Sequence, residues 1–292
     1  MAPFRRHKRV LIFFLAPQLV VTLVFFFLPA LSALWQSFQF GDAFGLHRRW
    51  AGLCNYIDLF QDPSYFQAVV VTLGLAIAIT TSCIILGVLM ANLLLAITGG
   101  RNIYKTMLIW PYAVAPAVAA ILWRFLFQPK LGWVAQTAQW FGMEFNYLTH
   151  PLQAMATIII TASWQQFSYN FLFFFAALSA IPKEIIEAAS LDGVSSWRLF
   201  WQIKLPLISP TTFFLLVMNL IYAFFDTFGI IDVMTHGGPA QYTTTLIYKV
   251  YQDGFVAFDP TSSATQSVIL MIVVSLMIWF QFRYVEKKVH YQ

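Results

Sequence analysis

Charged side chains are scarce in this sequence, and cysteine is nearly absent. Charged residues make up 10% of the 292 residues, whereas soluble globular chains average about 25%. The two cysteines are too few for a disulfide framework or a multi-thiolate metal site. Cys54 lies in a predicted loop and Cys83 in the middle of an apolar run, so we expect no disulfide between them. These shortages exclude an ordinary soluble domain and a disulfide-stapled scaffold.

The sequence also lacks the motifs of a nucleotide-binding or hydrolytic site. Residues 99–106 read GGRNIYKT, but a phosphate-binding P-loop needs glycine directly before its lysine. Tyr104 occupies that place. Neither H-E-x-x-H nor G-x-S-x-G is present, and the five histidines are scattered. We therefore expect no enzyme activity, no metal site and no ATP bound by this chain.

Long apolar runs are what the sequence has in abundance. Hydrophobic residues make up 60% of the chain, and the mean hydropathy is +0.71. A membrane-spanning helix needs roughly 20 apolar residues, and in lipid the backbone must satisfy its own hydrogen bonds. We predict an all-α integral membrane protein that forms a single domain over residues 1–292. Its six expected membrane helices are Val10–Leu34, Ala68–Ile97, Thr106–Trp123, Leu152–Ile181, Leu205–Phe225 and Pro260–Phe282.

Prolines and basic residues refine this topology. Pro17, Pro29, Pro111 and Pro116 lie in or near the first and third runs, where we expect kinks and no breaks. Most of the 17 lysines and arginines fall on the side of the N-terminus, which predicts that both termini are cytoplasmic. The pI of about 9.2 then reflects topology and gives no reason to expect nucleic-acid binding. The first apolar run is too long for a cleaved signal peptide.

The predicted cytoplasmic loop at residues 182–206 has the sequence of two short helices. Glu184 suits the N-terminal end of the first helix, and Gly193 suits the left-handed residue that follows its C-terminus. Ser195 can cap the second helix. We expect that helix to stop before Leu205-Pro206, because the residue before proline resists helical geometry. From the residues alone, docking onto another protein and resting on lipid headgroups are equally supported.

The pattern EAASLDG, followed by IKLP, resembles the EAA loop of ABC importer permeases. The resemblance implies that this loop docks into a cleft on an ATPase subunit and transmits its closure to the membrane helices. The stretches WPYAVAPAVAAILWRFLF and NLIYAFFDTF are similar to the carbohydrate-type permeases, above all to the A-type permease subunits of bacterial sn-glycerol-3-phosphate importers. The matching loop residues are Glu187, Ala188, Ala189, Asp192, Gly193, Leu205 and Pro206.

This resemblance implies a multi-pass subunit of the bacterial inner membrane that forms half of a path for sn-glycerol-3-phosphate or its diesters. It also implies a second, different permease, two ABC ATPases that bind ATP and Mg²⁺, and an external substrate-binding protein. A permease for another sugar or polyol is one alternative. An ion-coupled secondary transporter is another, but it would need intramembrane ionisable pairs and repeated halves. Asp226 alone offers a plausible acid for that alternative.

Polar side chains gather in the predicted fourth and fifth membrane helices. Their spacing puts Asn219, Tyr222 and Asp226 on one helix face. Singly, such residues more often join helices, for about 0.6 kcal/mol each; as a group they predict the lining of a translocation path. For Asp226 we expect pairing with a cation such as Arg124 or a residue of the partner permease. The path candidates are Trp164, Gln165, Ser168, Tyr169, Asn170, Asn219, Tyr222 and Asp226.

Overall fold

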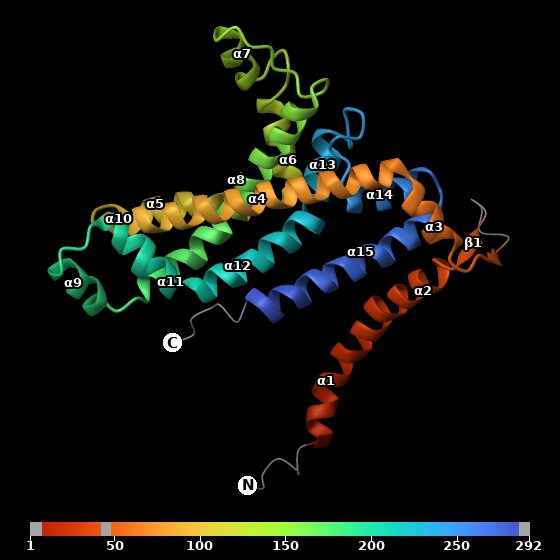
Figure 1. The fold of residues 1–292 in the computed structure, drawn as a ribbon, viewed down its shortest axis with the longest axis horizontal. Helices are drawn as coiled ribbons and strands as arrows, with labels where there is room; N and C mark the ends of the chain where they lie inside the picture. Colours follow the sequence, from red (N-terminus) through yellow and green to blue (C-terminus); the bar gives the residue numbers. More distant parts are fainter. Residues whose placement is uncertain (1–7, 42–47, 286–292) are drawn as a thin grey trace. The chain divides into compact units, whose positions relative to one another are not determined.

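The computed structural model describes residues 8–41 and 48–285, which are mostly helical (Figure 1). These residues fall into two compact units. The first consists of the described parts of Met1–Asp62 together with Val250–Ile272. The second consists of Pro63–Lys249 and the described part of Val273–Gln292. The single domain that we expected over residues 1–292 stays a prediction.

The first unit holds a long apolar helix and a short β-hairpin. The helix, Phe13–Gln36, has a mean hydropathy of 2.2, and its most apolar part is not buried within the chain. In the hairpin, Phe40 lies opposite Arg49, which departs from the all-α expectation. Trp50 stacks on Phe38 with ring centroids 5.8 Å apart and so holds the hairpin closed. The elements are α1 (Lys8–Thr22), η1 (Leu23–Phe27), α2 (Leu28–Gln36), β1 (Gln39–Gly41), β2 (Arg48–Trp50), α3 (Cys54–Gln61) and η5 (Gln252–Val256), while α15 (Pro260–Phe280) contributes to both units.

The second unit is built around two long helices, α4 (Pro63–Ala96) and α8 (Pro151–Ser179), which lie side by side (Figure 1). Leu94, Phe171 and Phe174 are buried in their shared core. The other elements before the loop at residues 182–206 are α5 (Arg101–Ile109), η2 (Trp110–Ala113), α6 (Pro116–Leu126) and α7 (Trp133–Trp140). Those from the loop onward are α9 (Lys183–Leu191), α10 (Ser196–Arg198), η3 (Leu199–Lys204), α11 (Leu205–Leu207), α12 (Ser209–Ile221), η4 (Tyr222–Asp226), α13 (Phe228–Met234), α14 (Leu246–Tyr251) and η6 (Gln281–Val285).

Four helices in the described chain are long and apolar enough to cross a membrane: Phe13–Gln36, Pro63–Ala96, Ser209–Asp226 and Pro260–Arg283. The bent pair of Arg101–Ala113 and Pro116–Leu126 makes a fifth if it counts as one span. Helix α8 has 29 residues, or roughly 44 Å at about 1.5 Å per residue, but its glutamines and asparagine lower its hydropathy. The count of six stays a prediction. Residues 1–7 and 286–292, on which the predicted orientation partly depends, lie outside the described residues.

The third predicted span is broken, where we expected only a kink. Its two halves meet at 100°, so that α6 turns away from the line of α5 (Figure 1). Between them, Val114 and Ala115 adopt extended backbone with ψ of 128° and 142°. The expectation for Pro111 and Pro116 is therefore wrong. Proline donates no hydrogen bond and drives the residue before it out of helical geometry. The prolines of the first span leave that helix continuous.

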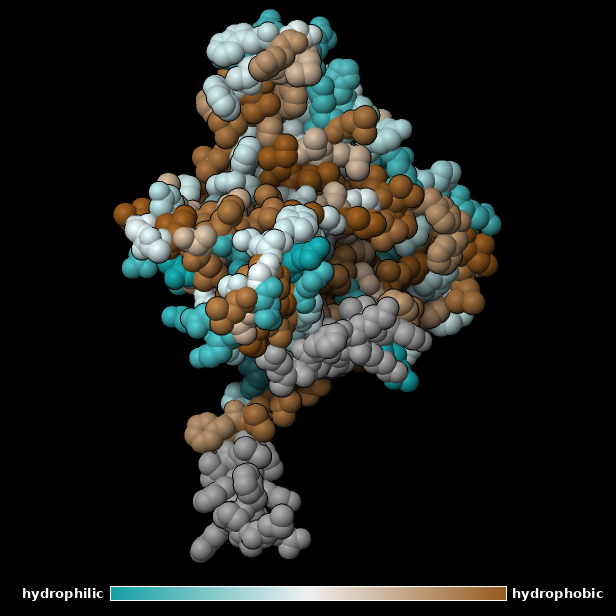
Figure 2. Space-filling model, turned by 60° about the vertical axis from the view of Figure 1, so that its left-hand side comes forward, coloured by the Kyte–Doolittle hydropathy of each residue, from teal (hydrophilic) through white to brown (hydrophobic). Residues whose placement is uncertain are grey.

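Large apolar side chains cover much of the surface. Figure 2 shows hydrophobic residues, coloured brown, spread over the face that it draws. Along one face of α4, for example, Val70, Leu73 and Ile77 are 69%, 48% and 65% exposed. Soluble monomers rarely expose apolar patches of this extent. This surface is therefore suited to contact with lipid or with other membrane helices.

Candidate functional site

The loop at residues 182–206 folds into two short helices, as the sequence predicts, and the first ends in a capped turn. Gly193 follows α9 with a left-handed φ of +72°. The backbone N–H of Val194 donates to the carbonyl of Ala189 at 3.1 Å, and that of Gly193 donates to Ser190 at 3.2 Å. These are the two hydrogen bonds of a Schellman C-cap. Glycine suits this place because it adopts positive φ without steric cost.

The second helix of the loop starts as predicted but ends later. Ser195 Oγ accepts the backbone N–H of Arg198 at 3.5 Å. Leu205 keeps helical φ and ψ of −63° and −45°, and the helix ends at Ile208, with φ of −94° and ψ of 11°. The predicted stop before Pro206 is wrong. The π-helical segment η3 directly precedes this proline. A π turn already lacks the regular α-helical backbone hydrogen bonds, so the helix loses little when Pro206 cannot donate one.

Most of the motif residues in this loop are exposed. A Cβ built on Gly193 would meet no atom within 4 Å. Leu191 and Trp197, beside the motif, are 89% and 70% exposed, so exposed apolar side chains flank it. Within the motif, Glu187, Ala188, Asp192, Gly193 and Pro206 are exposed, Leu205 is half-buried and Ala189 is buried.

A cavity of about 460 Å³ lies where the break in the third span faces α8, α12 and η4. Aromatic, amide and backbone groups form its wall, with one carboxylate, that of Asp226. Of the eight predicted path residues, Gln165, Tyr169, Tyr222 and Asp226 line it. The other lining residues are Tyr112, Ala113, Val114, Ala115, Pro116, Gln166, Met218 and Ile221.

Gln165 ties the broken span to the two helices behind it. Its Nε2 donates to the carbonyl of Val114 at 2.6 Å, and its Oε1 accepts the hydroxyl hydrogen of Tyr222 at 3.3 Å. Gln165 is 5% exposed. A carbonyl that the helix break leaves without a helical partner is thereby satisfied by a side chain, as a membrane interior requires.

Asn170 and Asn219 hydrogen-bond to each other and do not line the cavity. Asn219 Nδ2 donates to Asn170 Oδ1 at 2.7 Å, and Asn170 Nδ2 donates back to Asn219 Oδ1 at 2.9 Å. Gln166 Nε2 adds a contact to the same Asn219 oxygen at 3.3 Å. Both asparagines have no exposed surface. They therefore join α8 to α12, directly behind the cavity wall.

Trp164 and Ser168, also predicted for the path, lie away from this cavity. Trp164 lines a separate cavity with Trp123, and their ring centroids are 5.7 Å apart. Ser168 is buried, and its Oγ has no hydrogen-bond partner within the described residues. The sequence interpretation missed Tyr112, whose ring lies 5.5 Å from that of Tyr169. The prolines of PYAVAP were the available signal, but we interpreted them as kinks.

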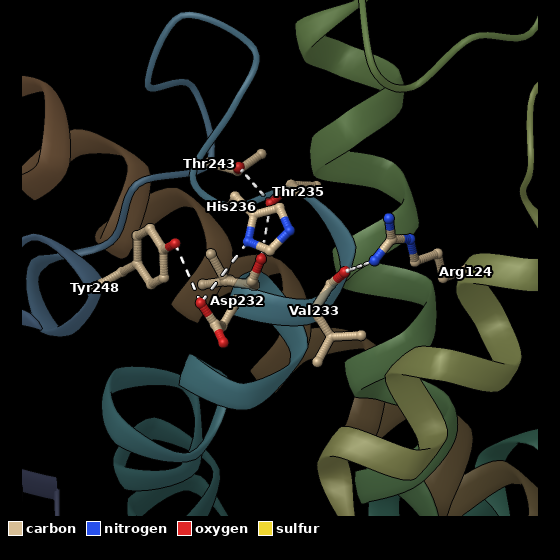
Figure 3. A network of polar contacts seen from close by, with 8 residues as sticks. Arg124, Asp232, Val233, Thr235, His236, Thr243 and Tyr248 are labelled. Atoms are coloured by element: carbon tan, nitrogen blue, oxygen red, sulfur yellow. Dashed lines mark hydrogen bonds and ion pairs between the residues drawn. The ribbon is translucent and has the colours of Figure 1, made fainter. Parts of the chain in front are cut away.

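Asp226 is exposed at the cavity, and Arg124 does not pair with it in the described chain. Arg124 Nη1 donates instead to the carbonyl of Val233 at 2.9 Å (Figure 3). Arg124 also hydrogen-bonds to Tyr147; burial raises the pKa of that phenol, and the arginine partly opposes this. The expectation that Asp226 pairs with Arg124 is therefore wrong. Pairing of Asp226 with a cation of a partner permease stays a prediction.

Comparisons with known proteins add to this geometry. Residues 83–291 match the family described as "Binding-protein-dependent transport system inner membrane component". The chain is 51% identical to the sn-glycerol-3-phosphate transport system permease protein UgpA of Brucella abortus, over 96% of this chain and 95% of that protein. A crystal structure of a bacterial ABC transporter involved in import of the acidic polysaccharide alginate gives a TM-score of 0.84. The identity is 22%, over 97% of this chain and 98% of that one. The alginate transporter crystallised with its alginate-loaded periplasmic protein gives 0.79 at 21% identity, over 96% and 95%.

Proposed function

Because the chain belongs to the binding-protein-dependent transport system inner membrane components, we propose that it is a permease subunit of an ABC importer for sn-glycerol-3-phosphate. The substrate assignment rests on the 51% identity, along 96% of the chain, to a permease of the sn-glycerol-3-phosphate transport system. Diesters of glycerol-3-phosphate are the second substrate class within this proposal.

The topology belongs to the same proposal: six membrane helices, α8 as the fourth, and both termini in the cytoplasm. The length of α8 supports its role as a span. The amide side chains of α8 support this role as well, because they are hydrogen-bonded. Asn170 bonds to Asn219, and Gln165 bonds to the Val114 carbonyl and to Tyr222. Polar groups that are paired inside a membrane protein cost far less in lipid than unpaired ones.

Residues 182–206 would dock onto an ATPase subunit and couple it to transport. The exposed Glu187, Ala188 and Gly193 support this role, since a partner can approach their backbone closely. Two ATPase subunits would bind ATP and Mg²⁺, and a second, different permease would complete the path. An external binding protein would deliver the solute, as the periplasmic protein bound to the alginate transporter illustrates.

The cavity at the helix break would form this chain's half of the translocation path. Amide and phenol groups suit a ligand rich in hydroxyls, and Tyr112, Tyr169 and Gln166 supply them. The carboxylate of Asp226 would repel a phosphate. We infer that the glycerol end of the solute, and not its phosphate, faces this wall.

Copurification and reconstitution test this function. The chain is purified in mild detergent from its native membrane, its companions are identified, and the complex is placed in vesicles with the binding protein. We expect uptake of labelled sn-glycerol-3-phosphate that stops when a non-hydrolysable ATP analogue replaces ATP. Competition by glycerophosphodiesters and by unrelated polyols then defines the substrate class. Solute movement by the chain alone, without an ATPase, would support an ion-coupled transporter instead.

A further inference from the structure

A second cavity of the same unit lies on a different face of α8 and is almost wholly apolar. Its volume is about 360 Å³, and residues of α4, α5, α6 and α8 line it. Its apolar lining includes Leu86, Met90, Leu108, Ile160, Trp164 and Phe167. None of them lines the cavity at the helix break. This apolar cavity is therefore separate from the proposed solute path.

Two cations stand at one end of this apolar wall. The guanidinium carbon of Arg101 lies 4.9 Å from the ring centroid of Phe175, and Lys105 Nζ lies 5.1 Å from the same centroid. Along α5, Arg101, Lys105 and Leu108 follow at i, i+4 and i+7, which places them on one helix face. Along α8, Phe167 and Phe175 are eight residues apart and also share a face. The cation pair and the apolar cavity are thus continuous along both helices.

Neither cation is neutralised within the described chain. The ion pair found among these residues joins His236 to Asp232, and no carboxylate there pairs with Arg101 or Lys105. Arg101 Nε is buried and has no hydrogen-bond acceptor among the described residues. Two like charges held over one ring repel each other. An anion with acceptor oxygens would offset the repulsion between Arg101 and Lys105 and would accept a hydrogen bond from Arg101 Nε.

We propose that this surface binds one anionic phospholipid, with its phosphate between Arg101 and Lys105 and an acyl chain in the apolar cavity. Phosphate oxygens form strong charge-assisted hydrogen bonds with guanidinium and ammonium groups. Basic pockets between membrane helices on the cytoplasmic side bind anionic headgroups, and the predicted topology places the start of α5 on that side. Leu108 lies one turn beyond Lys105, so the chain-binding wall begins where the headgroup site ends.

A lipid fits these observations better than the other occupants. A free anion would satisfy the cations but would leave the apolar wall without a ligand. A helix of a partner permease would cover the apolar wall but would bring no charge for Arg101 and Lys105 unless it carried an acid. A phospholipid supplies a phosphate and an apolar chain in one molecule, in the order in which the two parts of the site occur.

Native mass spectrometry of the purified importer complex tests the proposal. The complex is titrated with phosphatidylglycerol or with phosphatidylcholine of the same chains. We expect at least one tightly held phosphatidylglycerol, and about tenfold weaker retention in the double variant Arg101→Gln/Lys105→Gln, as the loss of charged hydrogen bonds predicts. The control Arg49→Gln/Lys130→Gln removes the same charge from exposed positions outside residues 182–206 and should retain the lipid normally.

A second variant tests the chain-binding part without touching the charges. Ile160→Trp fills the cavity and should also weaken retention, while the complex elutes at its normal size. Equal retention of the two lipids, or no change in the double variant, would overturn the proposal. So would displacement of the lipid by inorganic phosphate alone. Efficient crosslinking of a cysteine at Leu108→Cys to the partner permease would identify a protein helix as the occupant.

Discussion

Gly87 on α4 and Asn170 on α8 mark a close approach of the two helices. A Cβ on Gly87 would lie 2.6 Å from the Asn170 Cβ and 3.1 Å from its carbonyl carbon. Real Cβ atoms essentially never come within 3.0 Å of another heavy atom, and 3.1 Å is tighter than nine in ten real contacts. Neither of the two Asn170 atoms can rotate away. The missing side chain therefore lets α8 sit against α4. This approach fixes the position of Asn170, and with it the amide pair behind the cavity wall.

Gly87→Ala should destabilise the protein by about 1–3 kcal/mol, because an added methyl group overpacks this contact. The measurement is thermal unfolding of the purified protein in detergent. Gly74→Ala, on the same helix, is the matched control: its Cβ would lie 3.9 Å from the flexible end of Met155. That change should be neutral or slightly stabilising. Equal effects of the two variants would contradict a close contact at Gly87.

The reciprocal amide pair predicts strong coupling between Asn170 and Asn219. Replacing either one with leucine leaves a buried amide without its partner, which costs about 1–3 kcal/mol. Replacing both removes the orphaned group, so the double variant should lose less stability than the two single losses combined. A double-mutant cycle by thermal unfolding measures this difference. Simple additivity would show that the two amides do not depend on each other.

Features set by neighbouring residues were predictable from the sequence, while those set by distant contacts were not. Gly193 and Ser195 cap their helices as expected, because each cap depends only on the chain within a few residues. The continuation of the helix through Pro206 depends on a π turn that no local preference signals. The break before Pro116 is stable because Gln165, fifty-one residues away from Val114, satisfies the freed carbonyl.

The candidate site shows the same division. The sequence predicted Gln165 and Tyr169 for the translocation path, and both line the cavity. Residue spacing along α8 could not distinguish these two residues from Asn170. Whether a polar residue lines the cavity or joins two helices depends on which residue faces it from the neighbouring helix. Asn219 faces Asn170, so this polar residue is used for packing. Tyr112 was not predicted from the sequence, because its position at the cavity depends on the helix break.

Lys204 links the loop at residues 182–206 to α4 and should make stability depend on pH. Its Nζ donates to Asn92 Oδ1 at 2.9 Å, and burial lowers the pKa of Lys204 from its ordinary value of 10.5. The folded state thus binds this proton less tightly than the unfolded state does. Its stability should rise as pH rises from below the lowered pKa towards 10.5.

Lys204→Met should remove that pH-dependent gain, measured as the difference in unfolding temperature between variant and parent across alkaline pH. If the loop couples ATP hydrolysis to transport as proposed, this hydrogen bond links it to α4, so we expect the Lys204→Met variant to hydrolyse more ATP per solute transported in vesicles. Lys130→Met, an exposed lysine outside residues 182–206, is the control and should leave both measurements unchanged. A parallel pH profile for variant and parent would contradict the burial of Lys204.

Gly193 offers the sharpest test of coupling, because Gly142 matches it elsewhere in the chain. Their φ angles are +72° and +70°, and a Cβ at either would meet no atom within 4 Å. Replacement by leucine should therefore strain both backbones alike, by about 1–2 kcal/mol. Only Gly193 lies in the loop proposed to dock onto an ATPase.

We expect Gly142→Leu to lose a little stability and keep its uptake, and Gly193→Leu to lose uptake while the complex still hydrolyses ATP. Uptake and hydrolysis are measured together in the same vesicles. Gly193→Asn separates the two causes, since asparagine tolerates left-handed backbone but still adds a side chain at the docking surface. If asparagine restores uptake, strain is responsible. If it fails as leucine does, the partner must come close to the backbone at Gly193, and normal uptake by Gly193→Leu would refute the coupling role altogether.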